Sequence, residues 1–481
     1  MGPERYPHSS RRRRIIKAAG VAGIFSVAGC LGDDDDGDDD PGDGVADDDD
    51  GDDDDEVVEL GFMHPEGNPL GEFYEEISDD LEEEHGISLN SVGLADFQDR
   101  IGTFMGTDSA EVLGYNYNGP GHYGPFVEDG HIEPLHDLLD ESIFDTYEVG
   151  SQDFSYEDEE MLNWRLGYPE HAYGLGVEIT GLPIFYNNQI LEEAGLDSHE
   201  LQHRSDVTWS EMTDILKAVR DETDYIPFAS GNVNGKTYNY LLHGAIQATV
   251  GGDEFVATAL GQNDREWTDD EFVDALELIL EWEEEGLFNE DHLSIEEDDG
   301  RIRFFRNEAA FMSDGLWAFT VRYDAHADPD ELGPYGEDWD YFWWPYRPDV
   351  YENGQNELLG AVIGGHFITH RAEELGVKDE AAQVLEYMAR DDVQEKFVEV
   401  TGNIPARADA SDEFDLHDGA EAMMADIDEA DNLFPKMDMF LLPEVADAFE
   451  REAQGLATGQ SPEDILANIQ SVQEDAIGRY T

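Results

Sequence analysis

A strand runs directly into a helix in the segment Gly181-Leu182-Pro183-Ile184-Phe185-Tyr186-Asn187-Asn188-Gln189-Ile190-Leu191-Glu192-Glu193-Ala194-Gly195-Leu196. Its apolar part, 182–186, is typical of a buried strand, and 188–194 has the pattern of a helix. Gly195 follows the last helical residue, where a C-cap requires positive φ. The segment therefore predicts a strand–helix unit.

The same alternation begins earlier in the chain. Strands are predicted at 57–62, 87–92 and 111–115, and helices at 70–81 and 97–105. Alternating strands and helices favour an α/β fold with a parallel sheet. Ligands of such sheets gather at the carboxyl ends of the strands, here the loops 64–68 and 115–122.

Two later helices carry clear local signals. Thr208 and Glu211 form a capping box at the start of one helix. Residues 272–282 are amphipathic and are followed by Gly286, which is expected to end that helix.

The N-terminus has the features of a lipoprotein signal. Arg11–Arg14 and Lys17 precede the apolar run 18–29, which is too short to span a bilayer, and Val27-Ala28-Gly29-Cys30 is typical of a lipoprotein cleavage site. The paired arginines resemble a twin-arginine (Tat) export signal, and the Sec route stays open. We predict a signal peptide at 1–29, a lipidated Cys30, an acidic disordered tether at 30–56 and a location at the outer face of the cell membrane. The alternative is a basic arm with one buried thiol.

The composition is strongly acidic. The chain has 26 Lys and Arg against 116 Asp and Glu, a formal net charge of −90 that belongs mainly to the body after residue 56. No basic face exists to bind nucleic acid, which excludes that partner. Such a surface resembles that of salt-adapted archaeal proteins, since molar salt screens the repulsion. One cysteine allows no intramolecular disulfide, and the length of the body predicts two lobes.

Five segments, in order along the chain, resemble the extracellular solute-binding proteins (family 1, maltose-binding type) of carbohydrate ABC importers. They are 181–196, 208–212, 303–318, 380–392 with 402–407, and 461–476. The resemblance implies a two-lobed, type II periplasmic-binding-protein-like fold with three crossings between the lobes. Lobe one would hold 57–172 and 348–405, and lobe two 173–345 and 408–478. Gly174 and Gly176 offer hinge freedom at the first crossing.

A sugar needs aromatic rings against its faces and polar groups around its rim. The resemblance places a stacking tryptophan at Trp317, preceded by Asp314, and a sugar contact at Tyr186; for both aromatic residues a core role is the alternative. Trp343 and Trp344 are adjacent, so on an extended segment they face opposite ways and one is expected to line the cleft. The remaining candidates are Tyr115, Asn118, Glu66, Asn68, His171 and Tyr173.

No catalytic motif competes with a binding function. The chain has no His-Glu-x-x-His, no Gly-x-Ser-x-Gly and no phosphate loop, and its histidines lack metal-ligand spacing. We therefore predict a non-enzymatic, monomeric receptor, without cofactor or metal, that captures a sugar or oligosaccharide between its lobes and delivers it to an ABC permease. The alternatives are a receptor for another solute, such as a glycerol phosphodiester, and an extracellular glycosidase.

Overall fold

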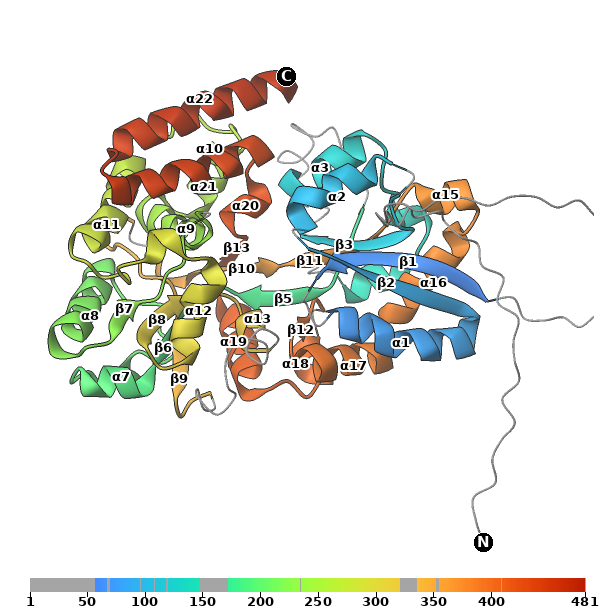
Figure 1. Ribbon diagram of the computed structural model, residues 1–481, viewed down its shortest axis with the longest axis horizontal. Coiled ribbons are helices and arrows are strands. Elements are labelled where there is room, and N and C mark those ends of the chain that lie inside the picture. The colour runs from blue at the N-terminus through green and yellow to red at the C-terminus, as the bar shows by residue number, and fades with distance from the viewer. Residues whose placement is uncertain are drawn as a thin grey trace, which may run out of the picture.

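The chain folds into two α/β lobes joined by strands that run between them (Figure 1). The computed structural model describes residues 57–66, 70–95, 97–107, 109–117, 120–147, 172–233, 235–320, 335–351, 354–407 and 409–480. The predicted signal peptide and tether lie outside these residues. None of the described helices combines the length and the apolar character needed to cross a membrane.

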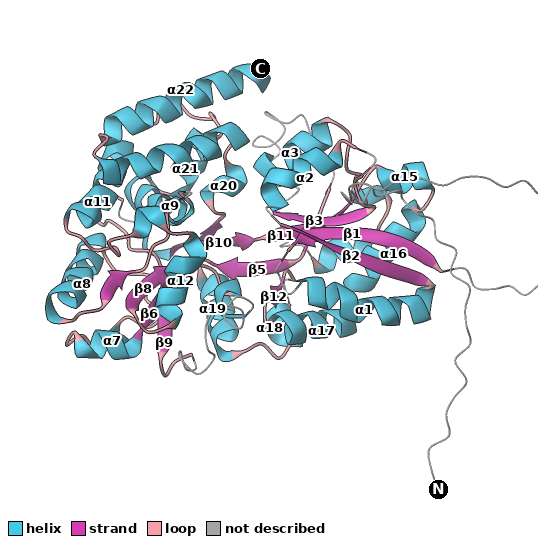
Figure 2. Cartoon of the chain, in the orientation of Figure 1, coloured by secondary structure: helices cyan, strands magenta, loops and turns pink. Residues whose placement is uncertain are grey.

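The first lobe is built on a five-stranded sheet in the order β2-β1-β3-β11-β4. β1 pairs in parallel with β2 and β3, whereas β11 is antiparallel to β3 and β4. Helices cover both faces of this sheet (Figure 2). Its elements are β1 (Val58–Pro65), α1 (Leu70–His85), β2 (Ile87–Leu94), α2 (Phe97–Met105), β3 (Leu113–Tyr117), α3 (Pro120–Glu128), α4 (Glu141–Thr146), β4 (Leu175–Gly176), β11 (Gly364–Ile368), α15 (Arg371–Leu375), α16 (Lys378–Met388) and α17 (Asp391–Thr401).

A second sheet connects the lobes. Its order is β12 (Ile404–Pro405), β5 (Glu178–Gly181), β10 (Glu357–Val362) and β13 (Asn432–Phe434). β5 follows β4 almost directly, and β10 leads into β11, so the chain passes between the lobes along both strands. α18 (Ala410–Glu413) follows β12, and α19 (Asp418–Glu429) packs on β5.

The second lobe is built on a four-stranded sheet, β7 (Ile226–Phe228), β8 (Ala309–Ser313), β6 (Ile184–Asn187) and β9 (Trp339–Phe342). Its helices are α7 (Asn188–Glu193), α8 (Trp209–Glu222), α9 (Lys236–Val250), α10 (Gly252–Ala259), α11 (Asp270–Glu284), α12 (Glu297–Phe305), α13 (Trp317–Thr320), α20 (Met437–Phe440), α21 (Pro443–Thr458) and α22 (Pro462–Tyr480). Most of them contribute to the larger core, whereas Phe304 and Phe305 of α12 belong to a second core. Short 3₁₀ helices lie at Leu135–Asp137, Ser198–Glu200, His292–Ser294 and Gly354–Asn356.

The α/β fold class and the two-lobed architecture are confirmed, with corrections in detail. The first sheet is mixed rather than parallel, because β11 returns from the other lobe in the direction opposite to β3 and β4. The loop expected at 115–122 is also wrong in part. β3 continues to Tyr117, and Pro120 begins α3, a position where its missing N–H costs nothing.

Two expected lobe boundaries shift along the chain. β4 still pairs with β11, so the chain leaves the first sheet only after Gly176. Residues 346–351 stay on the second lobe, where the Tyr346 N–H donates to Val207 O at 3.0 Å. The chain therefore passes from the second lobe back to the first along β10, and not at residue 348. The third boundary falls at β12, close to the expected 405.

Replacing Thr208 with alanine should destabilise the second lobe by about 1 kcal/mol. Both hydrogen bonds of the capping box predicted there are present. The Thr208 hydroxyl accepts from the Glu211 N–H at 3.2 Å, and the Glu211 carboxylate accepts from the Thr208 N–H. A fall in the thermal midpoint measures the loss. Thr208→Ser keeps the hydroxyl and should leave the midpoint nearly unchanged.

Candidate functional site

Four apolar side chains from both lobes and a crossing meet where the lobes touch. Tyr117 ends β3 in the first lobe, Trp317 begins α13 in the second, Ile363 lies between β10 and β11, and Met439 is on α20. Ile363 and Met439 are buried, whereas both rings keep part of their surface exposed. α20 contacts α3 at the same place, and Figure 1 shows these two helices facing each other between the lobes. We call these four residues the interlobe cluster.

Trp317 contacts two cores of the second lobe as well as the interlobe cluster. Its ring packs against the cores on either side of the second lobe's sheet. Gly315 makes that position possible, because a Cβ there would lie only 2.2 Å from the indole ring. The tryptophan is therefore held by the second lobe while part of its ring stays uncovered.

Polar and charged side chains lie beside the interlobe cluster. Lys436 Nζ stands 4.4 Å from the centroid of the Tyr240 ring and 2.9 Å from Asp438 Oδ2. Burial opposes its charge, but Asp438 and Tyr240 raise the pKa of Lys436 above its usual value. Burial likewise opposes ionisation of Asp438, yet Lys436 holds the pKa of that carboxyl below its usual range. The pair is therefore charged at neutral pH.

His122, on α3 of the first lobe, lies near the ion pair between Lys436 and Asp438. Its ring lies 5.9 Å from that of Tyr117, edge to face. Burial lowers the pKa of His122, while the charge of Asp438 opposes the shift. We call Tyr240, Lys436, Asp438 and His122 together the charged layer, after the ion pair between Lys436 and Asp438.

One carboxylate oxygen of the charged layer is unused. Asp438 Oδ1 is covered from solvent and has no hydrogen-bond partner among the residues that the structure describes. An unpaired buried acceptor costs free energy, about 1–3 kcal/mol. A ligand hydroxyl that enters when the lobes part and donates to Oδ1 would remove this cost.

Asp314 does not offer a free carboxylate, contrary to the sequence-based expectation. It is 1 % exposed and is bound by the Arg301 guanidinium, which is 7 % exposed. The Gly315 N–H also donates to Asp314 at 2.9 Å. Arg301 binds Glu297 at 2.8 Å and Asp298 as well. This ion-pair network positions the segment before Trp317.

Four predicted aromatic contacts lie in cores. Tyr186 is fully buried and its hydroxyl donates to Ser198 O at 3.0 Å, and Tyr115 is fully buried in the first lobe. Trp343 and Trp344 belong to different cores, and neither is a member of the interlobe cluster. Their indole N–H groups donate to Asp426 at 2.9 Å and to Leu182 O at 2.8 Å. The core alternative therefore describes Tyr186, and the expectation that one of the tryptophans lines the cleft is corrected.

The remaining candidates divide into two groups. Glu66 is exposed just after β1, and Tyr173 is half-buried against the cluster around Met63 and Tyr123. Neither belongs to the interlobe cluster. Asn68, Asn118, His171 and Cys30 lie outside the described residues.

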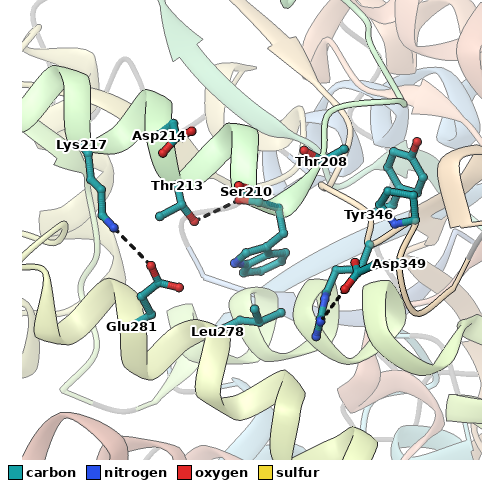
Figure 3. Close-up of a pocket in the computed structure, with 12 residues that line it drawn as sticks. Thr208, Ser210, Thr213, Asp214, Lys217, Leu278, Glu281, Tyr346 and Asp349 are labelled. Carbon is teal, nitrogen blue, oxygen red and sulfur yellow. Dashed lines mark hydrogen bonds and ion pairs between the residues drawn. The ribbon is translucent and has the colours of Figure 1, made fainter.

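A separate cavity opens on the second lobe, as Figure 3 shows. It has a volume of about 360 Å³ and is lined by residues of α8, of α11 and of the segment 346–349. Lys217 and Glu281 form an ion pair at 3.2 Å across the cavity. Arg347 and Asp349 form a second ion pair at 3.2 Å at its edge. No predicted site residue lines this cavity. Within the described part of the chain, no three His, Cys, Asp or Glu side chains are grouped as metal ligands would be.

The fold and the interlobe arrangement agree with a family comparison. The model of the family described as bacterial extracellular solute-binding protein matches residues 76–425. The chain belongs to this family. Solute-binding proteins of this kind act outside the cytoplasm, in agreement with the predicted extracellular location.

Solved structures share the fold of this solute-binding protein. A chitin oligosaccharide binding protein is 21% identical, with a TM-score of 0.72 over 88% of this chain and 99% of its own. The solute-binding protein RafE in complex with raffinose is 17% identical, with a TM-score of 0.67 over 87% and 100%. The GacH receptor of Streptomyces glaucescens, solved unliganded and with acarbose, is 15% identical, with a TM-score of 0.66 over 88% and 100%. No curated protein matches the chain.

Sequence reasoning missed most of the residues that this solute-binding protein brings to the lobe boundary. Five were not singled out at all: Tyr240, Ile363, Lys436, Asp438 and Met439. Tyr117 and His122 lie within the segment 115–122, which the sequence analysis named as a strand-end loop without singling out either residue. One signal was available: Lys436 is one of few lysines in a very acidic chain. For the apolar residues no local signal separates the lobe boundary from the core.

Proposed function

We propose that this solute-binding protein is the receptor of an ABC importer and captures a sugar or oligosaccharide between its lobes. The observation that carries the proposal is the interlobe cluster, in which partly exposed aromatic rings of both lobes, Tyr117 and Trp317, stand beside polar groups. Rings of this kind cover the C–H faces of a sugar, and the polar groups satisfy its hydroxyls. The sugar ligands named for the structural neighbours support the same class of ligand.

The mechanism is hinge closure. A ligand that contacts Tyr117 on one lobe and Trp317 on the other binds the closed form more tightly than the open form, and so shifts the equilibrium towards closed. The connecting sheet is the element that bends, since β5 and β10 carry the chain between the lobes. The closed surface would then be presented to the permease.

The anchor completes the proposal. Lipidation of Cys30 would hold the receptor at the outer face of the membrane, and the acidic tether 30–56 would let it reach the permease. The acidic body fits a salt-rich surrounding, where charge repulsion is screened. Mass spectrometry of the mature protein tests the anchor: a diacylglyceryl Cys30 at the N-terminus is expected, and an unmodified residue there would contradict it.

Isothermal titration calorimetry in molar salt tests the ligand class. The panel contains mono-, di- and trisaccharides together with glycerol phosphodiesters and short peptides. Binding of a saccharide with micromolar or lower Kd is expected. Binding only of glycerol phosphodiesters or peptides would replace the proposal with a receptor for that solute, and turnover of a chromogenic glycoside would replace it with a glycosidase.

A further inference from the structure

The cations beside the interlobe cluster are already neutralised by the protein itself. Arg301 binds Asp314, Glu297 and Asp298. Lys436 binds Asp438 at 2.9 Å and lies over the Tyr240 ring. In these two groups four carboxylates face two cations, so each cation already has a carboxylate partner within the protein.

A further acid lies behind the charged layer. The Glu450 carboxylate accepts from the Asn239 side chain at 2.8 Å, on the helix that also carries Tyr240. Burial and then the nearby charge of Asp438 raise the pKa of Glu450 to about 7. Burial is the largest cause, and the charge of Asp438 adds to it, while Lys436 and Lys236 oppose the shift.

We infer that the interlobe site selects uncharged saccharides against acidic ones, and that Asp438 determines this selection. The inference rests on the proposed function and specifies its substrate class. A neutral sugar donates a hydroxyl to Asp438 Oδ1, the acceptor that has no partner among the described residues. A uronic acid or a sugar phosphate meets the same carboxylate as a like charge, and Lys436 is not free to compensate. Discrimination arises from the repulsive element as much as from the attractive one.

The substitution Asp438→Asn separates the two roles of this carboxylate. It removes the strong charged acceptor, so a neutral sugar binds more weakly. It also leaves Lys436 without its counter-charge, so an acidic sugar binds more tightly. Opposite changes for the two ligands are the signature of the inference.

The experiment titrates the full chain in molar salt with saccharides of glucose, galactose and mannose and with the uronic acid counterpart of each. We expect the bound neutral saccharide to have a Kd at least 100-fold below that of its acidic counterpart. Asp438→Asn should raise the neutral Kd about tenfold and lower the acidic Kd. Lys436→Gln should weaken the acidic ligand more than the neutral one.

The matched control is Asp274→Asn, an exposed residue within α11 that makes the same change in net charge. It should leave the ratio of the two Kd values unchanged. Equal or tighter binding of the acidic saccharide, or a parallel shift of both ligands in Asp438→Asn, would overturn the inference and leave the proposed function intact. Absence of binding by every saccharide would instead remove the proposed function. Circular dichroism confirms that each variant is folded, and Asp438→Glu, which keeps the charge, should retain the discrimination.

Discussion

Trp317→Ala is expected to weaken saccharide binding at least tenfold, which corresponds to about 1.4 kcal/mol. The indole ring is held at the lobe boundary with part of its surface uncovered, beside Tyr117 of the opposite lobe. In the proposed function, this flat ring would cover a sugar face and link closure to ligand binding. Calorimetry with the saccharide found to bind measures the effect, and Trp317→Phe, which keeps a smaller ring, should lose less.

Trp343→Phe provides the matched control for a core tryptophan. It removes the indole N–H that donates to Asp426 and alters a side chain that is 1 % exposed. This variant should lower the thermal midpoint and leave the saccharide Kd unchanged. Because Trp317 also packs against two cores, its alanine variant should lose some thermal stability as well. Unchanged affinity in Trp317→Ala would show that Trp317 is only a core residue.

Glu178→Gln is expected to stabilise the protein above pH 7 by as much as about 3 kcal/mol. Glu178 is 5 % exposed in β5 of the connecting sheet, where Asn403 donates to its carboxylate. Burial raises the pKa of Glu178 to about 7, from 4.5 for a free side chain. The folded state therefore holds this proton more tightly than the unfolded state. The stability that protonated Glu178 contributes is fully present below pH 4.5 and is lost as the pH rises to 7.

Thermal midpoints at pH 4.5, 6 and 8 check this prediction. The difference between Glu178→Gln and the parent protein should be small at pH 4.5 and should grow to its full value at pH 8. Glu395→Gln removes an exposed carboxylate of α17 and should give the same small difference at each pH. A lower midpoint of Glu178→Gln at pH 8 would mean that the charged form is satisfied by its partners.

Local elements were predictable because their signals lie within a few residues. The capping box at Thr208, the C-terminal glycine of α7 and the bounds of α2 all depend on neighbours in sequence, and the structure confirms them. Gly195 and Gly286 have positive φ, as the helix ends require. The mixed first sheet was not predicted, because the direction of β11 depends on where the chain returns from the other lobe.

The site was predictable only in part. Trp317 lies at the lobe boundary, and the stacking contact with ligand that the resemblance implies for it stays a prediction. Tyr186, Trp343 and Trp344 have the same local pattern as a ligand-binding aromatic residue, yet they pack in cores. Which face of a strand meets the core depends on the layers packed against it, and a single sequence segment does not specify those layers.

The amino-acid sequence by itself determined the alternation of strands and helices, the acidic surface, the predicted N-terminal export features and the likeness to solute-binding proteins, because each is written in residues close together along the chain. Only the tertiary structure decided that Tyr117, Trp317, Ile363 and Met439 meet at one place. It also decided that Arg301 pairs with Asp314, whereas Asp438 Oδ1 has no hydrogen-bond partner in the described part of the chain. Ion pairing and burial depend on distances between segments far apart in sequence, and these distances exist only once the lobes have folded and come together.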